Sequence, residues 1–125
     1  MFILEQFLKS ANSSRNLANL GPSLSERYIM NFVVIGRDHT DADALNRRLA
    51  VREAHLAGME PLKAAGKVVY VAAMKNEEGN MNGSIIFFDV ESKDEVTEYL
   101  RTEPYIQNNV WKSYEIQEVA LPTTK

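Results

Sequence analysis

Two arginines and a histidine form the pattern in this sequence that is best suited to chemistry. Arg48, Arg52 and His55 stand at positions i, i+4 and i+7, a spacing that places them on one stripe of an α-helix. Guanidinium groups bind carboxylates and phosphates, and an imidazole transfers protons near neutral pH. The stripe therefore indicates a pocket for an anionic group. The alternative is that the arginine stems only cover apolar surface while their charges stay in water.

The helix that carries this stripe is expected to span residues 42–65. Thr40 or Asp41 would cap its start, with Asp43 in the first turn, where the helix dipole favours an acid. Gly66 suits the left-handed residue that ends many helices. Four apolar residues beside the stripe are expected to form the buried face of the helix: Leu45, Leu49, Leu56 and Met59. The two arginines and the histidine would then lie along the edge of that face.

The remaining elements are predicted from apolar runs and turn residues. A capping box of Ser92 and Glu95 predicts a second helix, which must end before Pro104. Runs of β-branched and aromatic residues predict four strands, at 32–35, 67–74, 84–90 and 111–119. The resulting order, β-α-β-β-α-β, predicts a ferredoxin-like α+β fold with both helices on one face of an antiparallel sheet.

The third strand predicts how the other face of the sheet is covered. Its two faces are both apolar, because Ile86 and Phe88 alternate with Ile85 and Phe87. One layer of helices buries only one of these sets. The second set predicts a homodimer in which two copies pack through the open face of the sheet.

The composition excludes several classes of function. The chain has 125 residues, a net charge of −3 and no cysteine, so a nucleic-acid partner, a disulfide and a cysteine-ligated zinc site are not expected. His39 and His55 are its only histidines, too few for a multi-histidine metal centre within one chain. No apolar run approaches the roughly 20 residues of a membrane-spanning helix. We expect a small-molecule ligand, with no membrane association.

The first 29 residues differ from the rest of the chain. They contain five serines and a Gly-Pro break at Gly21 and Pro22. They fit either an N-terminal helical arm or an organelle-targeting presequence, although Glu5 and Glu26 oppose the second interpretation. The first interpretation implies a cytoplasmic location and the second a mitochondrial one. The core domain is expected at 30–121, with a polar tail at 122–125.

Several short motifs, taken in order, resemble the YCII-related (YciI-like) family over about residues 31–121. They are the stretch 38–56 with Arg48, Arg52 and His55, the pair Gly83-Ser84 that opens the third strand, and Glu103-Pro104-Tyr105 after the second helix. The resemblance implies a dimeric α/β barrel. It also implies that His55 and Glu103 face each other in a pocket as an active-site pair, with Arg48 and Ser84 around it.

Two departures from the family pattern affect that pocket. Ala72-Ala73-Met74 stands where the family often has Gly-Gly-Pro, so Met74 is expected in the pocket wall, where it would alter the shape of the pocket. Glu103 replaces the usual aspartate and is longer by one methylene. The carboxylate would favour a charged His55, whereas the two arginines would oppose that charge.

The resulting hypothesis is a small-molecule enzyme of lyase or isomerase type that needs neither a metal nor an organic cofactor. Some members of the resembled family remove chloride from chlorinated aromatic hydroxyl compounds. In this chain Arg48 and Arg52 would bind an anionic or phenolic substrate, Ser84 would donate a hydrogen bond, and Tyr105 and Trp111 would provide aromatic walls. The alternative is a non-catalytic ligand-binding or protein-interaction domain of the same fold. An oxygenase has less support, because the only evident haem ligand is His55.

Overall fold

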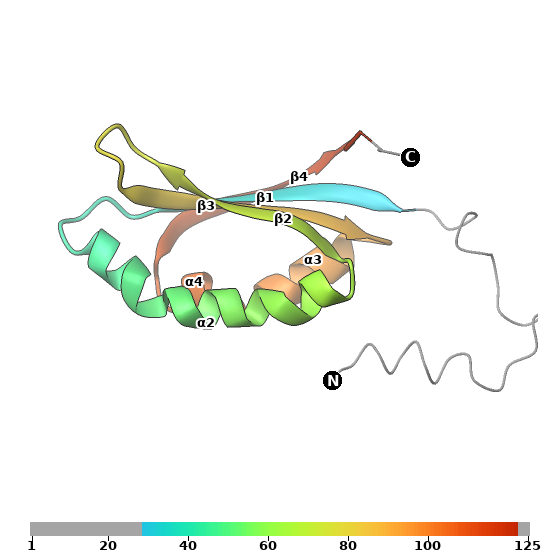
Figure 1. Cartoon of the computed structure of the whole chain (residues 1–125), viewed down its shortest axis with the longest axis horizontal. Helices are drawn as coiled ribbons and strands as arrows, with labels where there is room; N and C mark the ends of the chain where they lie inside the picture. The colour runs from blue at the N-terminus through green and yellow to red at the C-terminus, as the bar shows by residue number, and fades with distance from the viewer. Residues whose placement is uncertain (1–28, 123–125) are drawn as a thin grey trace, which may run out of the picture.

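A four-stranded antiparallel sheet with helices on one of its faces makes up the computed structural model (Figure 1), which describes residues 29–122. In chain order the elements are β1 (Met30–Asp38), α2 (Ala44–Ala64), β2 (Val68–Lys75), β3 (Met81–Val90), α3 (Lys93–Leu100), α4 (Pro104–Gln107) and β4 (Trp111–Val119). The predicted ferredoxin-like α+β fold is therefore confirmed. The N-terminal arm and the end of the tail lie outside the described residues.

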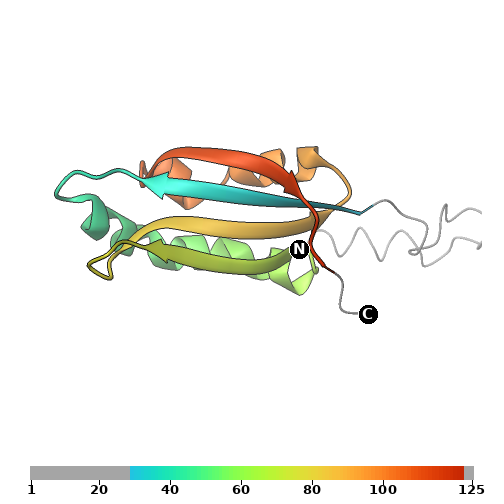
Figure 2. The same ribbon diagram turned by 90° about the horizontal axis from the view of Figure 1, so that it is seen from above.

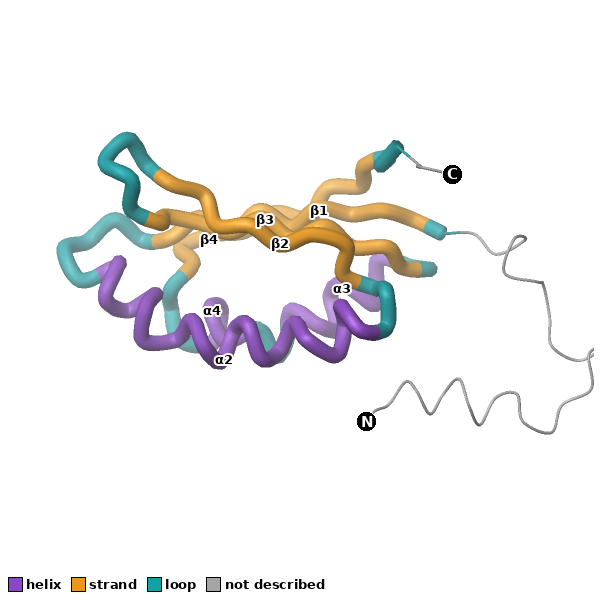
Figure 3. Tube along the Cα trace, viewed as in Figure 1, coloured by secondary structure: helices purple, strands orange, loops and turns teal. Residues whose placement is uncertain are grey.

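The sheet places β1 and β3 at its centre, in the order β2-β3-β1-β4 (Figure 2). Val34 at the middle of β1 pairs with Ile86 of β3 on one side and with Ile116 of β4 on the other. Val34 and Ile86 are completely buried, because helices cover this face of the sheet (Figure 3). The core thus lies between the central strands and the helical layer.

The buried face of α2 differs from the prediction. Leu49 was expected in the core but is 49% exposed, whereas Arg48 and His55 are buried together with Met59. The two chemical residues therefore lie in the middle of the helix–sheet interface, not along its edge. Charged and polar groups occupy a core only when partners satisfy them, and here those partners come from other elements.

The helix ends lie close to the predicted positions, but the hydrogen bonds at the helix starts differ from the predicted ones. Gly66 has a φ of 77° after the end of α2, as expected. Asp43 is the N-cap residue of α2, not a first-turn residue, and its side chain makes no capping bond. Ser92 does occupy the N-cap of α3, but the predicted capping box is absent, because the Glu95 carboxylate accepts from the backbone N–H of Glu91 instead.

The segment between α3 and β4 contains an element that the sequence did not predict as a helix. Pro104–Gln107 forms the short helix α4, which begins with proline at its first position, where the missing N–H costs nothing. Asn109 then takes a φ of 59° and turns the chain into β4. This helix is important for the site, because Glu103 is its N-cap residue.

The face of the sheet away from the helices carries apolar side chains. Ile85 and Phe87 of β3 are half-buried on this face, and Tyr70 on the edge strand β2 is 68% exposed. The alternation predicted for the third strand is thus observed. Among the residues that the structure describes, no helix is long and apolar enough to cross a membrane.

Candidate functional site

A cavity of about 130 Å³ lies between α2 and the strands β2 and β3. Its polar lining comes from the predicted residues Arg48, Arg52, His55 and Ser84, together with Tyr105. The apolar lining includes Leu56, Val71, Ala73 and Ile86. Residues that are far apart in the sequence therefore meet around one small space.

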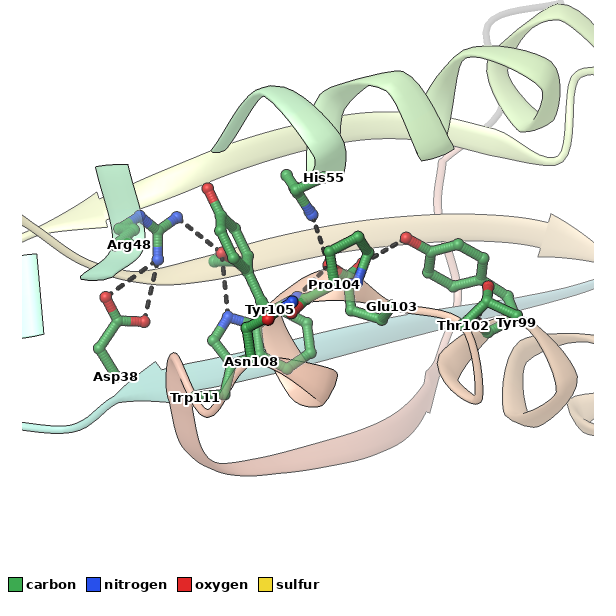
Figure 4. Close-up of polar contacts among 11 residues, drawn as sticks. Asp38, Arg48, His55, Tyr99, Thr102, Glu103, Pro104, Tyr105, Asn108 and Trp111 are labelled. Carbon is green, nitrogen blue, oxygen red and sulfur yellow. Dashed lines mark hydrogen bonds and ion pairs between the residues drawn. The ribbon is translucent and has the colours of Figure 1, made fainter. Parts of the chain in front are cut away.

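His55, which lines this cavity, contacts Glu103, which lies behind it and does not line the cavity (Figure 4). The ring Nδ1 of His55 lies 2.7 Å from the Glu103 Oε2 atom, and Glu103 is completely buried. Because an ionised carboxylate only accepts hydrogen bonds, this contact requires the proton on Nδ1. The longer glutamate side chain therefore reaches the imidazole with hydrogen-bond geometry.

Two further donors complete the surroundings of the Glu103 carboxylate. The backbone N–H of Tyr105 donates to Oε2 at 3.0 Å, as expected for an N-cap acceptor at the start of α4. The hydroxyl of Tyr99, on α3, donates to the other oxygen, Oε1. Sequence reasoning missed Tyr99. Its position four residues before the predicted acid was the available signal.

Burial fixes the protonation of the two tyrosines near the carboxylate. It raises the pKa of Tyr99 well above the ordinary value, and the negative charge of Glu103 raises it further. Burial likewise raises the pKa of Tyr105, against the opposing charges of Arg48 and Arg52. Both phenols therefore stay neutral, and Tyr99 acts toward Glu103 as a hydrogen-bond donor.

The ring of Tyr105 is held between the imidazole and a guanidinium group. It stacks on His55 with ring centroids 4.1 Å apart and an angle of 16° between the planes. The Arg48 Cζ atom lies 4.6 Å from the centroid of the same ring. Cation–π attraction helps to stabilise Arg48 there. Tyr105 thus fixes the orientation of both cavity residues.

The buried charge of Arg48 is compensated by Asp38, at the end of β1. Its Nη1 atom donates to both carboxylate oxygens of Asp38, at 2.9 and 3.1 Å. Burial raises the pKa of Asp38, and the nearby guanidinium opposes that effect. Sequence reasoning also missed Asp38. An acid three residues after the predicted apolar strand, at the end of β1, was the available signal.

Ser84 links this ion pair to the core. Its Oγ accepts a hydrogen bond from Arg48 Nη2 at 2.8 Å and another from Trp111 Nε1 at 3.3 Å. Since both groups donate to it, the hydroxyl proton of Ser84 is used by neither contact. Within the described residues, Arg48 Nε is buried without a hydrogen-bond partner. Two donors of residues that line the cavity are therefore not used by another protein group that the structure describes: the Ser84 hydroxyl and Arg48 Nε.

Of the other predicted site residues, Arg52 lines the cavity, whereas Met74 and Trp111 do not. Arg52 lines the cavity and is exposed to solvent. The prediction for Met74 was wrong. Met74 pairs with Gly83, whereas its neighbour Ala73 pairs with Ser84, so Met74 lies on the opposite face of the sheet from the cavity. Trp111 is buried behind Ser84 and does not line the cavity.

The arrangement is suited to moving a proton. Because Glu103 binds Nδ1–H, the neutral His55 ring has its lone pair on Nε2 and accepts a proton there. The carboxylate then stabilises the charged ring. No group of three or more potential metal-binding side chains comes together between residues 29 and 122.

Comparisons with known proteins give the chain a family and a structural neighbour. It is 27% identical over 94 residues to protein YciI of Escherichia coli O6:H1 and, equally, of Shigella flexneri; each match covers 70% of this chain and 94% of the relative. The solved 5-chloro-2-hydroxyhydroquinone dehydrochlorinase (TftG) of Burkholderia phenoliruptrix AC1100, in complex with 2,5-dihydroxybenzoquinone, superposes with a TM-score of 0.63. It shares 25% identity, and the match covers 73% of this chain and 94% of TftG. The model of the YCII-related domain matches residues 30–120. The chain therefore belongs to the YCII-related domain family.

Proposed function

We propose that this protein is a small-molecule enzyme in which His55 and Glu103 act as a general acid–base pair. The observation that carries the proposal is the 2.7 Å contact between these two buried side chains, of which His55 lines the cavity. A buried structural histidine also needs a hydrogen-bond partner, but it does not need a cavity beside its ring, and His55 lines one. A catalytic histidine uses both.

The division of roles is based on the hydrogen bonds. Glu103 keeps the proton of His55 on Nδ1, so Nε2 is the atom that removes a proton from the substrate and later returns it. The stack of Tyr105 against the imidazole restricts the rotation of the ring. General acid–base catalysis of this kind contributes about 10²- to 10⁴-fold to the rate.

The size of the cavity supports a substrate with one ring. An apolar protein cavity of about 150 Å³ holds benzene, and the cavity here has a volume of about 130 Å³. The cavity is therefore about the size of one six-membered ring, and ring substituents would extend toward the solvent-exposed side of the cavity at Arg52.

The donors in the cavity support a substrate that carries an acidic oxygen. Arg48 Nε and the Ser84 hydroxyl are buried donors, and Arg52 adds a second positive charge. An oxyanion in the cavity would be stabilised by the positive charge of Arg52 and by a hydrogen bond from the Ser84 hydroxyl. We therefore propose a hydroxylated aromatic or quinoid compound, bound as its anion.

The reaction would be a lyase or isomerase step that begins with the removal of a proton. The neighbour TftG is named a dehydrochlorinase and was solved with 2,5-dihydroxybenzoquinone. On a chlorinated ring, His55 would accept a proton from the substrate, and chloride would leave with the electron pair of the C–Cl bond. The sum of these two steps is the elimination of HCl. On a ring without a leaving group, return of the proton to another atom gives an isomerisation.

The test is turnover of 5-chloro-2-hydroxyhydroquinone, monitored by chloride release, in the native protein and two variants. His55→Gln and Glu103→Gln should each reduce turnover by about 100-fold or more, because they remove the base or the group that orients it. His39→Gln is the matched control. His39 lies in the loop after β1, where its ring contacts the Asn109 side chain, and it does not line the cavity.

Two results would argue against catalysis by this pair. Full turnover by the His55→Gln variant would exclude the imidazole from the reaction. Tight binding of 2,5-dihydroxybenzoquinone by the native protein, without turnover of any ring compound in the same series, would favour the non-catalytic binding domain.

We also propose that the apolar open face of the sheet packs against a second copy of this chain. A patch of the half-buried Phe87 and Ile85 with Tyr70, which is 68% exposed, is of the kind that monomers rarely expose. Phe87→Glu should convert a dimer to a monomer in light scattering. Tyr114→Glu, an equally drastic change on the face that bears the helices, should leave the dimer intact. A monomeric native protein would contradict the proposal.

A further inference from the structure

The hydrogen bond from Tyr99 to Glu103 has no part in the acid–base step itself. We propose that Tyr99 is the positioning residue of the site, because its hydroxyl occupies Glu103 Oε1 and so directs Oε2 toward His55. This inference rests on the proposed function, since it assigns a role to the residue behind the acid–base pair. Tyr99 touches neither the cavity nor a substrate there.

The two oxygens of Glu103 have separate partners. Oε2 accepts from His55 Nδ1 at 2.7 Å and from the Tyr105 backbone at 3.0 Å. Oε1 accepts from the Tyr99 hydroxyl (Figure 4). A carboxylate that is completely buried needs a donor at each oxygen to remain charged. Within the part of the chain that the structure describes, Tyr99 is the donor that serves Oε1.

Tyr99 is suited to this role because its hydroxyl is a hydrogen-bond donor that stays neutral. Its burial and the charge of Glu103 both raise its pKa and favour the neutral phenol, so the hydroxyl keeps its proton. A neutral donor stabilises the Glu103 anion without neutralising it. A lysine or arginine in this place would form a full ion pair with Glu103 and compete with His55 for its charge.

The fold brings the hydroxyl to this place because Tyr99, on α3, packs against two other elements, β3 and α2. Tyr99 lies in the last turn of α3, and its ring packs 6.1 Å from that of Phe88 on β3. On the α2 side, a Cβ added at Gly58 would lie only 3.9 Å from the Tyr99 hydroxyl. Gly58 is three residues after His55, so the hydroxyl lies against α2 about one turn beyond the imidazole.

Removal of the hydroxyl should therefore act on His55 without touching it. Oε1 would be left without its donor, and the carboxyl would be satisfied by turning away from His55 or by taking up a proton. In either case the acceptor for Nδ1–H is lost or weakened, and the proton of the neutral ring moves more easily to Nε2. A hydrogen bond to a charged group typically changes such an equilibrium by about 10-fold or more.

The experiment is ¹⁵N NMR of the His55 ring in the full chain, for the native protein and Tyr99→Phe. The native ring should be in the Nδ1–H form. In Tyr99→Phe the ratio of the Nδ1–H to the Nε2–H form should fall by about 10-fold. Tyr70→Phe is the matched control, since it removes the hydroxyl of a tyrosine that is 68% exposed on the opposite face of the sheet.

The outcomes separate this inference from the proposed function. An unchanged His55 signal in a folded Tyr99→Phe protein overturns the positioning role, whereas only the turnover of His55→Gln decides whether the pair is catalytic. If Tyr99→Phe does not fold, incorporation of 3-fluorotyrosine at position 99 keeps the hydroxyl and changes its acidity. The His55 signal should then shift, and the absence of a shift would equally overturn the role.

Discussion

Removal of Asp38 should expose how strongly the fold depends on one buried ion pair. The side chains of Arg48 and Asp38 are only 3% and 2% exposed, and Nη1 lies 2.9 Å from Oδ1. Asp38→Ala leaves the guanidinium buried without its counter-charge, a change that typically costs about 3–5 kcal/mol. The total stability of a small domain is about 5–15 kcal/mol. This single substitution should therefore remove a large share of the free energy of unfolding.

Urea denaturation measures this loss directly. Trp111 is the only tryptophan of the chain and is 5% exposed, so its fluorescence reports the unfolding of the core. With a urea dependence of about 1–3 kcal/mol per molar, a loss of about 3 kcal/mol or more lowers the midpoint by at least about 1 M. The protein concentration is kept constant, because association would add to the apparent stability.

A second Arg–Asp pair provides the matched control. Arg47 and Asp41 are also 2.9 Å apart, but their side chains are 27% and 51% exposed. Asp41→Ala should leave the midpoint nearly unchanged, because solvent screens an exposed pair. Replacing both Arg48 and Asp38 by apolar residues should recover most of the lost stability, since no uncompensated charge remains. The reasoning is refuted if Asp38→Ala unfolds at the same urea concentration as the control.

Three further predictions concern single positions. Gly36→Ala should destabilise the fold by about 1–3 kcal/mol and shift the fluorescence of Trp111, because the new Cβ would lie 2.2 Å from its ring; unchanged emission would contradict this. Gly66→Ala should cost about 1 kcal/mol in thermal unfolding, since φ is 77° there; a gain in stability would show that the helix end rearranges. The hydrogen bond from Arg47 lowers the pKa of Asp41 to about 2, so its stabilising effect is complete above the ordinary aspartate pKa and is lost as the pH falls toward 2. In Arg47→Gln, an NMR titration of Asp41 should give a pKa near the ordinary value, and a pKa still near 2 would assign the shift to other groups.

The sequence by itself determined the order and the type of the elements. The last strand was predicted at 111–119 and is β4 (Trp111–Val119), because its β-branched and aromatic residues begin right after the turn and end before a polar tail. The end of α2 at Gly66 was also predictable, since a left-handed position strongly favours glycine. These features depend on interactions between near neighbours in the chain, which a pattern of residue types records.

The tertiary structure decided which polar residues are buried. A hydrophobic pattern places charged side chains outside, so it put Leu49 in the core and Arg48 at its edge, and both assignments were wrong. Arg48 is buried because Asp38 compensates its charge, and Glu103 is buried because Tyr99 and His55 donate to it. Such partners come from different elements, and their distances exist only after the chain has folded. The register of β2 against β3 likewise placed Met74 on the face opposite the cavity.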